Sequence, residues 1–400
     1  MSRPERFREL WDQLAPIGRD PASRGYLRFA WSPPELALRE WFRAQAALRH
    51  MPVEEDGNGN QFAWWGEPAG GDSVVTGSHF DSVPHGGGYD GPLGIVSAFL
   101  AVDDLRACGV TQPHRPIGVA AFAEEEGARF GVPCLGSRLL TGSLDPATAA
   151  AFTDADGTTL ADAIGAQPAG HRPDLIARIG AFVELHIEQG RALVDRDVAV
   201  GVAEAIWPHG RWRFDFRGEG NHAGTTRMAD RRDPMLTYAF AVLAANKEAR
   251  LRGAHATVGR VAVEPNATNA IPARVRGWLD ARAAHPATLD DLVEAVHKKV
   301  AERAARDGTR VDLHRESATP VVEFDPALAA RLSRLLGDAP VLPTGAGHDA
   351  GVLAAHVPTA MLFVRNPTGV SHAPAESATD ADCAAGVAAL ADVLAELACR

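Results

Sequence analysis

Five short segments of the 400-residue chain hold side chains of the types that bind divalent metal ions. The segments GSHFDS, GGGYDG, AEEEGARF, ELHIEQG and GVSHAPAE contain His79, Asp81, Asp90, Glu124, Glu125, Glu126, His186, His372 and Glu376. Each segment alone could be an ordinary turn or loop, because isolated motif matches have a high false-positive rate. Together, three histidines, one isolated aspartate and a glutamate pair form the ligand inventory of a hydrolase with two metal ions.

The spacing of these residues suggests distinct roles. His79 and Asp81 are two apart in one β segment, so their side chains share a face, and Asp81 can accept a hydrogen bond from His79 and fix its tautomer. Adjacent glutamates suit a division of labour. One binds a metal ion, and its neighbour takes a proton from the attacking water and passes it to the leaving nitrogen.

The first half of the chain alternates between strand and helix patterns. Apolar, β-rich runs cover 73–80, 116–123 and 181–187, and a helical spacing covers 92–107. This alternation predicts an α/β fold with a largely parallel sheet covered by helices. Because ligands bind beyond the carboxyl ends of the strands in such sheets, the polar residues that follow these runs are expected to meet.

From residue 211 the pattern changes to β-α-β-β-α-β, the order of a ferredoxin-like sandwich. The expected elements are strand 211–217, helix 234–251, strands 256–264 and 273–282, helix 289–305 and strand 309–316. We therefore predict a catalytic domain in two parts, 1–210 and 323–400, interrupted by an inserted α+β domain over 211–322. The exposed edge strand and helices of the inserted domain would form a two-fold homodimer interface.

Composition excludes other classes of protein. Lys and Arg number 40 against 51 Asp and Glu, and a net charge of −11 disfavours nucleic acid as a partner. No apolar run is long enough to span a membrane, and the charged first residues lack the apolar core of a signal peptide. The four cysteines show no C-x-x-C spacing. We expect a cytoplasmic protein with no membrane partner.

Several motifs in sequence order resemble the carbamoylase and allantoate-amidohydrolase branch of the M20 metallopeptidase family. They are GSHFDSVPHGGGYDGPLG, AEEEGARFG, ELHIEQG, GNHAGTTRM, PNATNAIP, GAGHDA and GVSHAPAE, and the resemblance runs from about residue 25 to the C-terminus. It implies a dinuclear catalytic domain interrupted by a smaller dimerisation domain.

The resemblance also implies the ligands of two divalent ions per subunit. One ion would be bound by His79, Asp90 and His186, and the other by Asp90, Glu126 and His372, so that Asp90 bridges them. Zinc or manganese is expected, and cobalt or nickel also suits imidazole and carboxylate ligands.

Glu125 falls at the family's general acid/base position. A more distant M20 pattern selects Glu124 and Glu125 as base and ligand instead. We favour Glu125 and Glu126, since in the closer relatives the metal ligand directly precedes the glycine, here Gly127.

Further roles follow from the same resemblance. His222, contributed across the dimer, would stabilise the oxyanion as the planar carbonyl becomes tetrahedral. The residues expected to hold the substrate α-carboxylate are Gln189, Asn269 and Arg282. His348 and Asp349 match a motif near the substrate pocket, although a helix-capping turn explains them equally well.

Two residues depart from the family pattern. Arg227 stands where relatives usually have proline in GTTPM, and Arg365 stands where the strand before the last histidine usually runs into a proline. Arg365 is seven residues before His372 and could meet a second carboxylate on an acidic substrate. The alternative is that it reflects only the general preference of this chain for arginine.

The expected reaction is hydrolysis of a non-peptide C–N bond in a small substrate that carries a carboxylate. N-carbamoyl-L-amino acids and allantoate-type ureido acids come first, and N-formyl amino acids such as N-formylglutamate come second. An M20 aminoacylase or dipeptidase is a further alternative. A non-catalytic scaffold is disfavoured because Glu125 and all five ligand positions are present.

Overall fold

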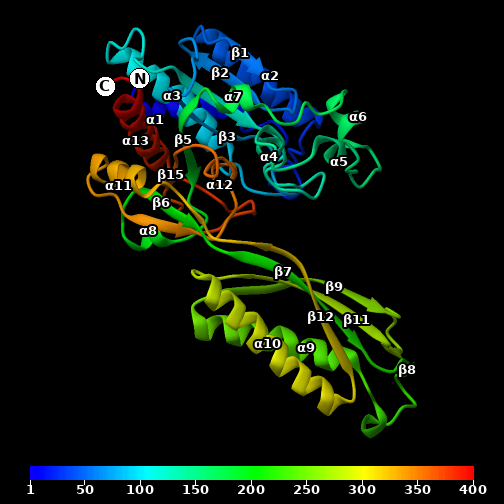
Figure 1. The fold of residues 1–400 in the computed structure, drawn as a ribbon. Coiled ribbons are helices and arrows are strands. Elements are labelled where there is room, and N and C mark those ends of the chain that lie inside the picture. The colour runs from blue at the N-terminus through cyan, green and yellow to red at the C-terminus, as the bar shows by residue number, and fades with distance from the viewer. The chain divides into compact units, whose positions relative to one another are not determined.

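The computed structural model describes residues 1–400, which divide into two compact units (Figure 1). The first unit comprises Met1–Glu204 and Glu323–Arg400, and the second comprises Ala205–Val322.

The first unit is built on a nine-stranded mixed sheet. Its order is β1 (Val53–Glu55), β2 (Gln61–Trp65), β4 (Ile117–Phe122), β3 (Ser73–His79), β5 (Ile179–Ile187), β15 (Thr359–Val364), β6 (Val200–Ile206) and β13 (Val322–Glu323), with β14 (Val341–Thr344) paired to β6. The four central strands, β4, β3, β5 and β15, run parallel, whereas β2 and β6 flank them antiparallel. The α/β fold with a large, mostly parallel sheet is therefore confirmed.

Helices cover both faces of this sheet. Helices α1 (Arg3–Leu14), α3 (Pro92–Ala107) and α13 (Asp380–Ala398) pack together with the strands in one large apolar core. Helix α3 is buried on almost all sides because it lies between the sheet and the other two helices, which explains its nearly uniform apolar sequence. The remaining helices are α2 (Pro33–Leu48), α4 (Leu135–Leu140), α5 (Pro146–Ala150), α6 (Leu160–Ile164), α7 (Pro173–Ile176), α8 (Ala192–Asp195), α11 (Pro326–Leu335) and α12 (Asp349–Leu353).

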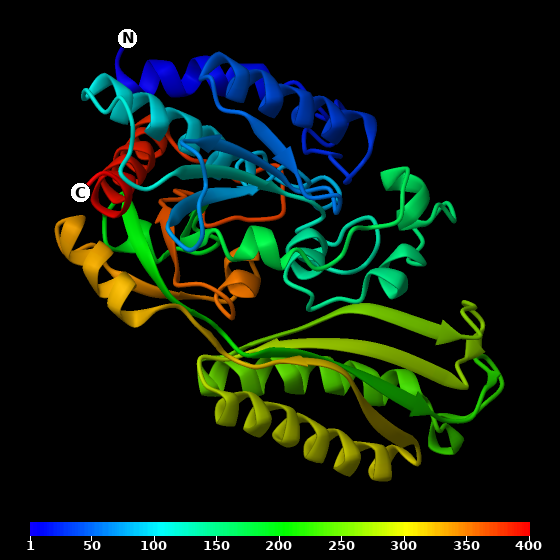
Figure 2. The same ribbon diagram turned by 45° about the horizontal axis from the view of Figure 1, so that its top comes forward.

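The second unit is a four-stranded antiparallel sheet with two helices on one face (Figure 2). Its strands follow the order β12 (Arg310–Thr319), β7 (His209–Arg217), β11 (Arg274–Arg282) and β9 (His255–Glu264), and its helices are α9 (Pro234–Arg252) and α10 (Pro286–Asp307). Burial alternates along β11, so Val275, Leu279 and Ala281 join the core with the helices. A short ribbon of β8 (Asn221–His222) and β10 (Ala270–Ile271) is separate from this sheet.

No helix in either unit has both the length and the apolar character required to cross a membrane.

Candidate metal centre

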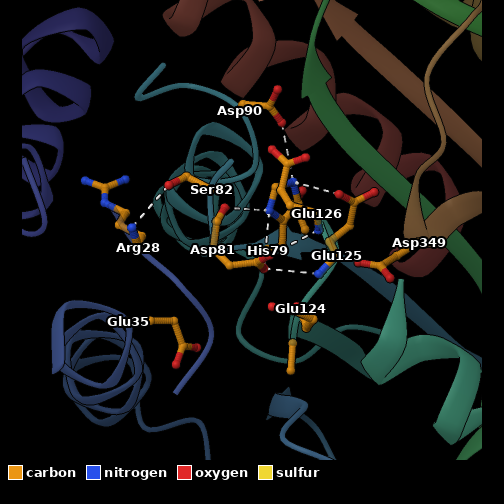
Figure 3. Close-up of polar contacts among 12 residues, drawn as sticks. Arg28, Glu35, His79, Asp81, Ser82, Asp90, Glu124, Glu125, Glu126 and Asp349 are labelled. Atoms are coloured by element: carbon orange, nitrogen blue, oxygen red, sulfur yellow. Dashed lines mark hydrogen bonds and ion pairs between the residues drawn. The ribbon is translucent and has the colours of Figure 1, made fainter. Parts of the chain in front are cut away.

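The parallel strands of the first unit bring the predicted ligands to one edge of the sheet. Strand β3 ends at His79, the glutamate triplet follows β4, and His186 is the second-last residue of β5. Asp90 precedes helix α3, and His372 lies in the segment between β15 and α13. Figure 3 shows Asp81, Asp90, Glu125 and Glu126 gathered around His79.

Asp90 lies between two groups of ligand atoms. Its Oδ1 is 3.5 Å from Nε2 of His79 and 3.1 Å from Nε2 of His186. Its Oδ2 is 3.4 Å from Nε2 of His372, and that nitrogen is 3.5 Å from Oε2 of Glu126. The two groups, His79–Asp90–His186 and Asp90–Glu126–His372, are the two ligand sets expected from the sequence, and each could hold an ion.

Backbone carbonyls set the tautomers of the two buried histidines. Nδ1 of His79 lies 3.0 Å from the carbonyl oxygen of Asp81, and Nδ1 of His186 lies 2.9 Å from that of Ile187. Because a carbonyl only accepts, each Nδ1 carries the hydrogen and donates it. Each Nε2 then offers its lone pair toward Asp90, as a metal ligand must.

The charges at the site favour bound cations. Burial lowers the pKa of His79, but the carboxylates of Glu125, Asp90 and Asp81 outweigh it and raise that pKa well above its usual value. Burial acts to raise the pKa of Asp90, and the imidazoles of His186 and His79 hold it well below its usual value. Positive charge at these nitrogens is thus stabilised, whether a proton or a metal ion supplies it.

Unpaired atoms test whether metal ions fit here. Nε2 of His79, Nε2 of His186 and Oε1 of Glu126 are buried and have no hydrogen-bond partner. An unsatisfied buried polar atom costs about 1–3 kcal/mol, so three of them in one cluster call for a ligand. Imidazole nitrogens with carboxylate oxygens suit zinc and the neighbouring divalent ions, and the donor set fits two ions that share Asp90.

Glu125 and Glu126 both face the cluster. Oε2 of Glu125 lies 3.7 Å from Nε2 of His79, and Oε2 of Glu126 lies beside His372. Burial raises the pKa of both glutamates well above the usual value, reinforced at Glu125 by Glu126.

Glu124 points elsewhere (Figure 3). Its Oε1 accepts hydrogen bonds from the backbone N–H groups of Arg129 at 2.8 Å and Phe130 at 2.7 Å. Burial, reinforced by Asp81, raises its pKa to about 8. Glu124 therefore shapes the loop after β4, whereas Glu125 and Glu126 face the ligand cluster.

The carboxylate of Asp81 makes different contacts from those expected. Its Oδ1 is 3.6 Å from Nδ1 of His79, too far for a good hydrogen bond, and the Asp81 backbone carbonyl fixes the tautomer instead. The carboxylate accepts from the backbone N–H groups of Glu125 at 3.2 Å and Glu126 at 3.1 Å. In this structure the hydrogen bond from His79 thus goes to the Asp81 backbone carbonyl, while the Asp81 side chain holds the glutamate loop.

Two predicted substrate residues adjoin the ligands. Nε2 of Gln189 donates to Oδ2 of Asp90 at 2.8 Å. The ring of His348 lies 4.5 Å from that of His186, centroid to centroid, and neither of its nitrogens has a hydrogen-bond partner. Burial, reinforced by His186, lowers the pKa of His348 far below its usual value, so this imidazole is neutral. Asp349 begins α12 and accepts a hydrogen bond from Ser137.

Sequence reasoning assigned no specific role to two buried acids near the centre, one of which, Glu376, it named only as a metal-binding type. Glu184 lies close to His186 and His348, but its oxygens accept from Ser78 Oγ at 2.9 Å and from the Ala350 N–H at 3.0 Å. It therefore supports α12 rather than acting as a free ligand. A charged residue within an otherwise apolar strand is the signal that could have found it.

The second is Glu376, four residues after His372 in GVSHAPAE. Its Oε1 accepts from the N–H groups of Tyr89 and Asp90. Burial, reinforced by Asp90, raises the pKa of Glu376 to about 7.

The other predicted residues of the reaction lie in the second unit. His222 is exposed on β8, and its Nδ1 accepts from the N–H groups of Gly224 at 3.0 Å and Thr225 at 3.1 Å. A neutral His222 therefore carries its hydrogen on Nε2. The side chain of Asn269 is exposed beside this ribbon, and Arg282, at the end of β11, donates through Nε to Asp280 at 2.9 Å.

Both arginines that depart from the family pattern are paired within the chain. Arg365 contacts the buried Asp382 twice, at 2.9 and 2.8 Å, and Asp197 at 2.8 Å. These contacts anchor the start of α13, and a contact of Arg365 with a substrate carboxylate stays a prediction. The exposed Arg227 donates to Asp230 at 2.7 Å.

Comparisons with known proteins agree with this geometry. The chain is 36% identical to the N-carbamoyl-L-amino acid amidohydrolase of Geobacillus stearothermophilus, covering 100% of this chain and 99% of that protein. It is 34% identical to the allantoate amidohydrolase of Escherichia coli, covering 98% of each. A hydantoinase/carbamoylase family amidase from Burkholderia multivorans superposes with a TM-score of 0.87 at 32% identity, over 99% of this chain and 98% of that one. The family model for peptidase family M20/M25/M40 matches residues 75–396, and the chain belongs to this family.

Proposed function

We propose that this protein is a metal-dependent amidohydrolase that cleaves a non-peptide C–N bond of an N-carbamoyl-L-amino acid or an allantoate-type ureido acid. The observation that supports this most directly is the position of Asp90, whose two oxygens serve two separate ligand groups, with Glu125 beside them. The two relatives named above are amidohydrolases of an N-carbamoyl-L-amino acid and of allantoate, which carry the same class of bond.

The residues of the chain divide the work of this reaction. Two divalent ions, held by His79, Asp90, His186, Glu126 and His372, would polarise the substrate carbonyl and activate water. Glu125 takes a proton from the attacking water and delivers it to the leaving nitrogen. It is free to do so because it lies beside His79 but belongs to neither ligand group. Asp81 keeps Glu125 in place through the backbone.

The remaining groups in this proposal are His222, Asn269 and Arg282 of the second unit, together with Gln189 and His348 of the first. His222 donates from Nε2 to the developing oxyanion, a role that its backbone-fixed tautomer suits. Gln189, Asn269 and Arg282 bind the substrate carboxylate, with Arg282 oriented by Asp280. His348, neutral and buried beside His186, lines the acyl end of the pocket.

We also propose that the second unit forms a homodimer. Helix α9 exposes Leu236, Leu243 and Leu251, whose spacing of seven and eight residues places them on one face of the helix. Two of these side chains are 70% and 68% exposed. An apolar stripe of this kind on an outer helix supports a symmetric contact with a second copy.

The test of the activity is a substrate panel with metal-reconstituted protein. It compares allantoate, N-carbamoyl-L-methionine, N-carbamoyl-L-glutamate, N-formyl-L-glutamate, N-acetyl-L-glutamate and a dipeptide. We expect ammonia from allantoate or a carbamoyl compound and none with His79→Ala as the control. Formate from the formyl compound alone, turnover of only the acetyl compound or dipeptide, or no turnover at all would overturn the proposal.

A further inference from the structure

Glu376 ties together two ligand-bearing segments that are far apart in the sequence. It is buried, with 5% of its surface exposed, and its Oε1 accepts from the N–H groups of Tyr89 at 2.9 Å and Asp90 at 3.0 Å. It follows His372 by four residues. One carboxylate oxygen thus connects the segment of the last ligand to the backbone of the residue shared by both ligand groups.

A second contact reinforces this connection. Oγ of Ser371 donates to Oδ2 of Asp90 at 3.3 Å, and Nε2 of His372 is 3.4 Å from the same oxygen. Ser371 reaches the Asp90 side chain while Glu376 holds the Asp90 backbone. The orientation of Asp90 therefore depends on the segment from 371 to 376.

Gly87 makes room for Glu376. A Cβ atom on Gly87 would lie 2.3 Å from Oε1, 2.4 Å from Cδ and 2.5 Å from Cβ of Glu376. The backbone of Gly87 does not have a positive φ, so the position requires space rather than a special conformation. The loop between β3 and α3, which contains Gly87 and Asp90, thus leaves space for the Glu376 side chain.

We propose that Glu376 is a positioning residue for the metal centre, which sets Asp90 so that its two oxygens can serve two ions. This inference rests on the metal sites proposed above. The contact of Glu376 with Asp90 runs through the backbone, because its Oε1 accepts the N–H groups of Tyr89 and Asp90. Groups that orient a ligand typically change metal affinity when removed, although they do not touch the ion.

The experiment is a titration of the metal-free full-length protein with Co²⁺, followed by visible absorption. The wild type is expected to bind two ions per chain. Glu376→Ala removes the acceptor, and we expect affinity to fall by about 10- to 100-fold with a changed absorption spectrum. Glu376→Gln keeps a carbonyl oxygen for both N–H groups and should restore affinity and spectrum close to those of the wild type.

Glycine variants test the same contact from the opposite side. Gly87→Ala should displace Glu376 and reproduce the Co²⁺ affinity of Glu376→Ala. Gly70→Ala is the matched control, because a Cβ there meets nothing within 4 Å, and it should bind Co²⁺ like the wild type. If Glu376→Ala fails to fold, Glu376→Met retains the volume without the acceptor and takes its place in the comparison with glutamine.

The outcomes separate this inference from the proposed function. Wild-type affinity and spectrum in Glu376→Ala or Glu376→Met would overturn the positioning role, even if the variant melts at a lower temperature. Failure of the Gln variant to restore binding would also overturn it, since charge rather than geometry would then matter. If the wild type itself bound no Co²⁺, the metal centre and hence the proposed function would fail.

Discussion

Three consecutive glutamates in this chain have three different surroundings. Glu124 turns back to accept from the loop that follows it, Glu125 lies beside His79, and Glu126 lies beside His372. Identical side chains are distinguished here only by the path of the backbone, which takes a positive φ of 53° at Glu124. Such a conformation is uncommon outside glycine and occurs where a loop must turn sharply at a functional site.

This difference predicts opposite results for two substitutions of the same chemical size. Glu125→Gln should lower kcat by about 100- to 10,000-fold, because the amide cannot take a proton from water. Glu124→Gln should retain most of the activity, since its carbonyl oxygen can still accept from Arg129 and Phe130. The measurement is kcat of both variants on the preferred substrate from steady-state kinetics, with the metal content of each variant determined alongside. The reverse order of activities would make Glu124 the base.

At this scale the sequence reveals residue types better than their partners. His79 and His186 could be predicted to lie near each other, because each stands at the carboxyl end of an apolar run that is visible in the sequence. The partners of Arg365 and Asp81 could not be predicted, because Asp382 and the Glu125 N–H group approach them only in the folded chain. Which of several partners a side chain contacts depends on distances in the folded chain, and these cannot be read from the sequence.

Loops of the first unit are held by buried carboxylates that each accept two successive backbone N–H groups. Asp81 holds Glu125 and Glu126, Glu376 holds Tyr89 and Asp90, and Glu188 holds Ala192 and Leu193. Charged acceptors form stronger hydrogen bonds than neutral ones, so each carboxylate fixes a loop at the end of a strand or the start of a helix.

Removal of one such acceptor should affect stability and activity together. Asp81→Ala leaves two N–H groups without their acceptor, at about 1–3 kcal/mol for each that stays buried, and lets the glutamate loop move. Urea unfolding of the metal-free protein and kcat of the metal-loaded protein measure the two effects.

The control for Asp81 is an exposed aspartate outside the site that also accepts a backbone N–H group. Asp145 is exposed and caps α5 through Thr148, so Asp145→Ala should cost about 1 kcal/mol and leave kcat unchanged. An Asp81→Ala variant with the same small loss of stability and full activity would contradict the role assigned to this carboxylate.

Elements were predictable where their hydrophobic pattern is long. The run 73–80 appears as β3 (Ser73–His79) and 181–187 lies within β5 (Ile179–Ile187), because continuous apolar runs mark buried parallel strands. The antiparallel flank of β1 and β2 and the short helices α5 and α6 were not predicted. Elements of three to five residues are too short to display a period.

The whole molecule distributes the proposed reaction over two units. Glu125 and the metal ligands belong to the first unit, whereas His222, Asn269 and Arg282 belong to the second. The four sheet strands and two helices of the second unit follow the order β-α-β-β-α-β that the periodicity indicated, and the short strands β8 and β10 lie outside this sheet. The exposed leucines of α9 could not be recognised from the sequence, since the helix is apolar on several sides and only burial separates its core from its surface.

If the second unit joins two chains and His222 serves the site of its partner, two inactive variants should restore each other. His222→Ala lacks the oxyanion donor, and Glu125→Ala lacks the base. In a mixed dimer the His222→Ala subunit keeps its own Glu125 and receives an intact His222, so one of the two sites regains every group. With random exchange of subunits in an equal mixture, half of the dimers are mixed, and activity should return to about a quarter of the wild-type level.

Subunits are unfolded and refolded together to allow exchange, and each variant refolded alone provides the background rate. No recovery, in a mixture shown by mass to contain mixed dimers, would place His222 at the site of its own chain. A monomeric mass for the wild type would instead reject the dimer itself, and Leu243→Glu with Leu251→Glu, which charges the exposed stripe of α9, should then have no effect on activity.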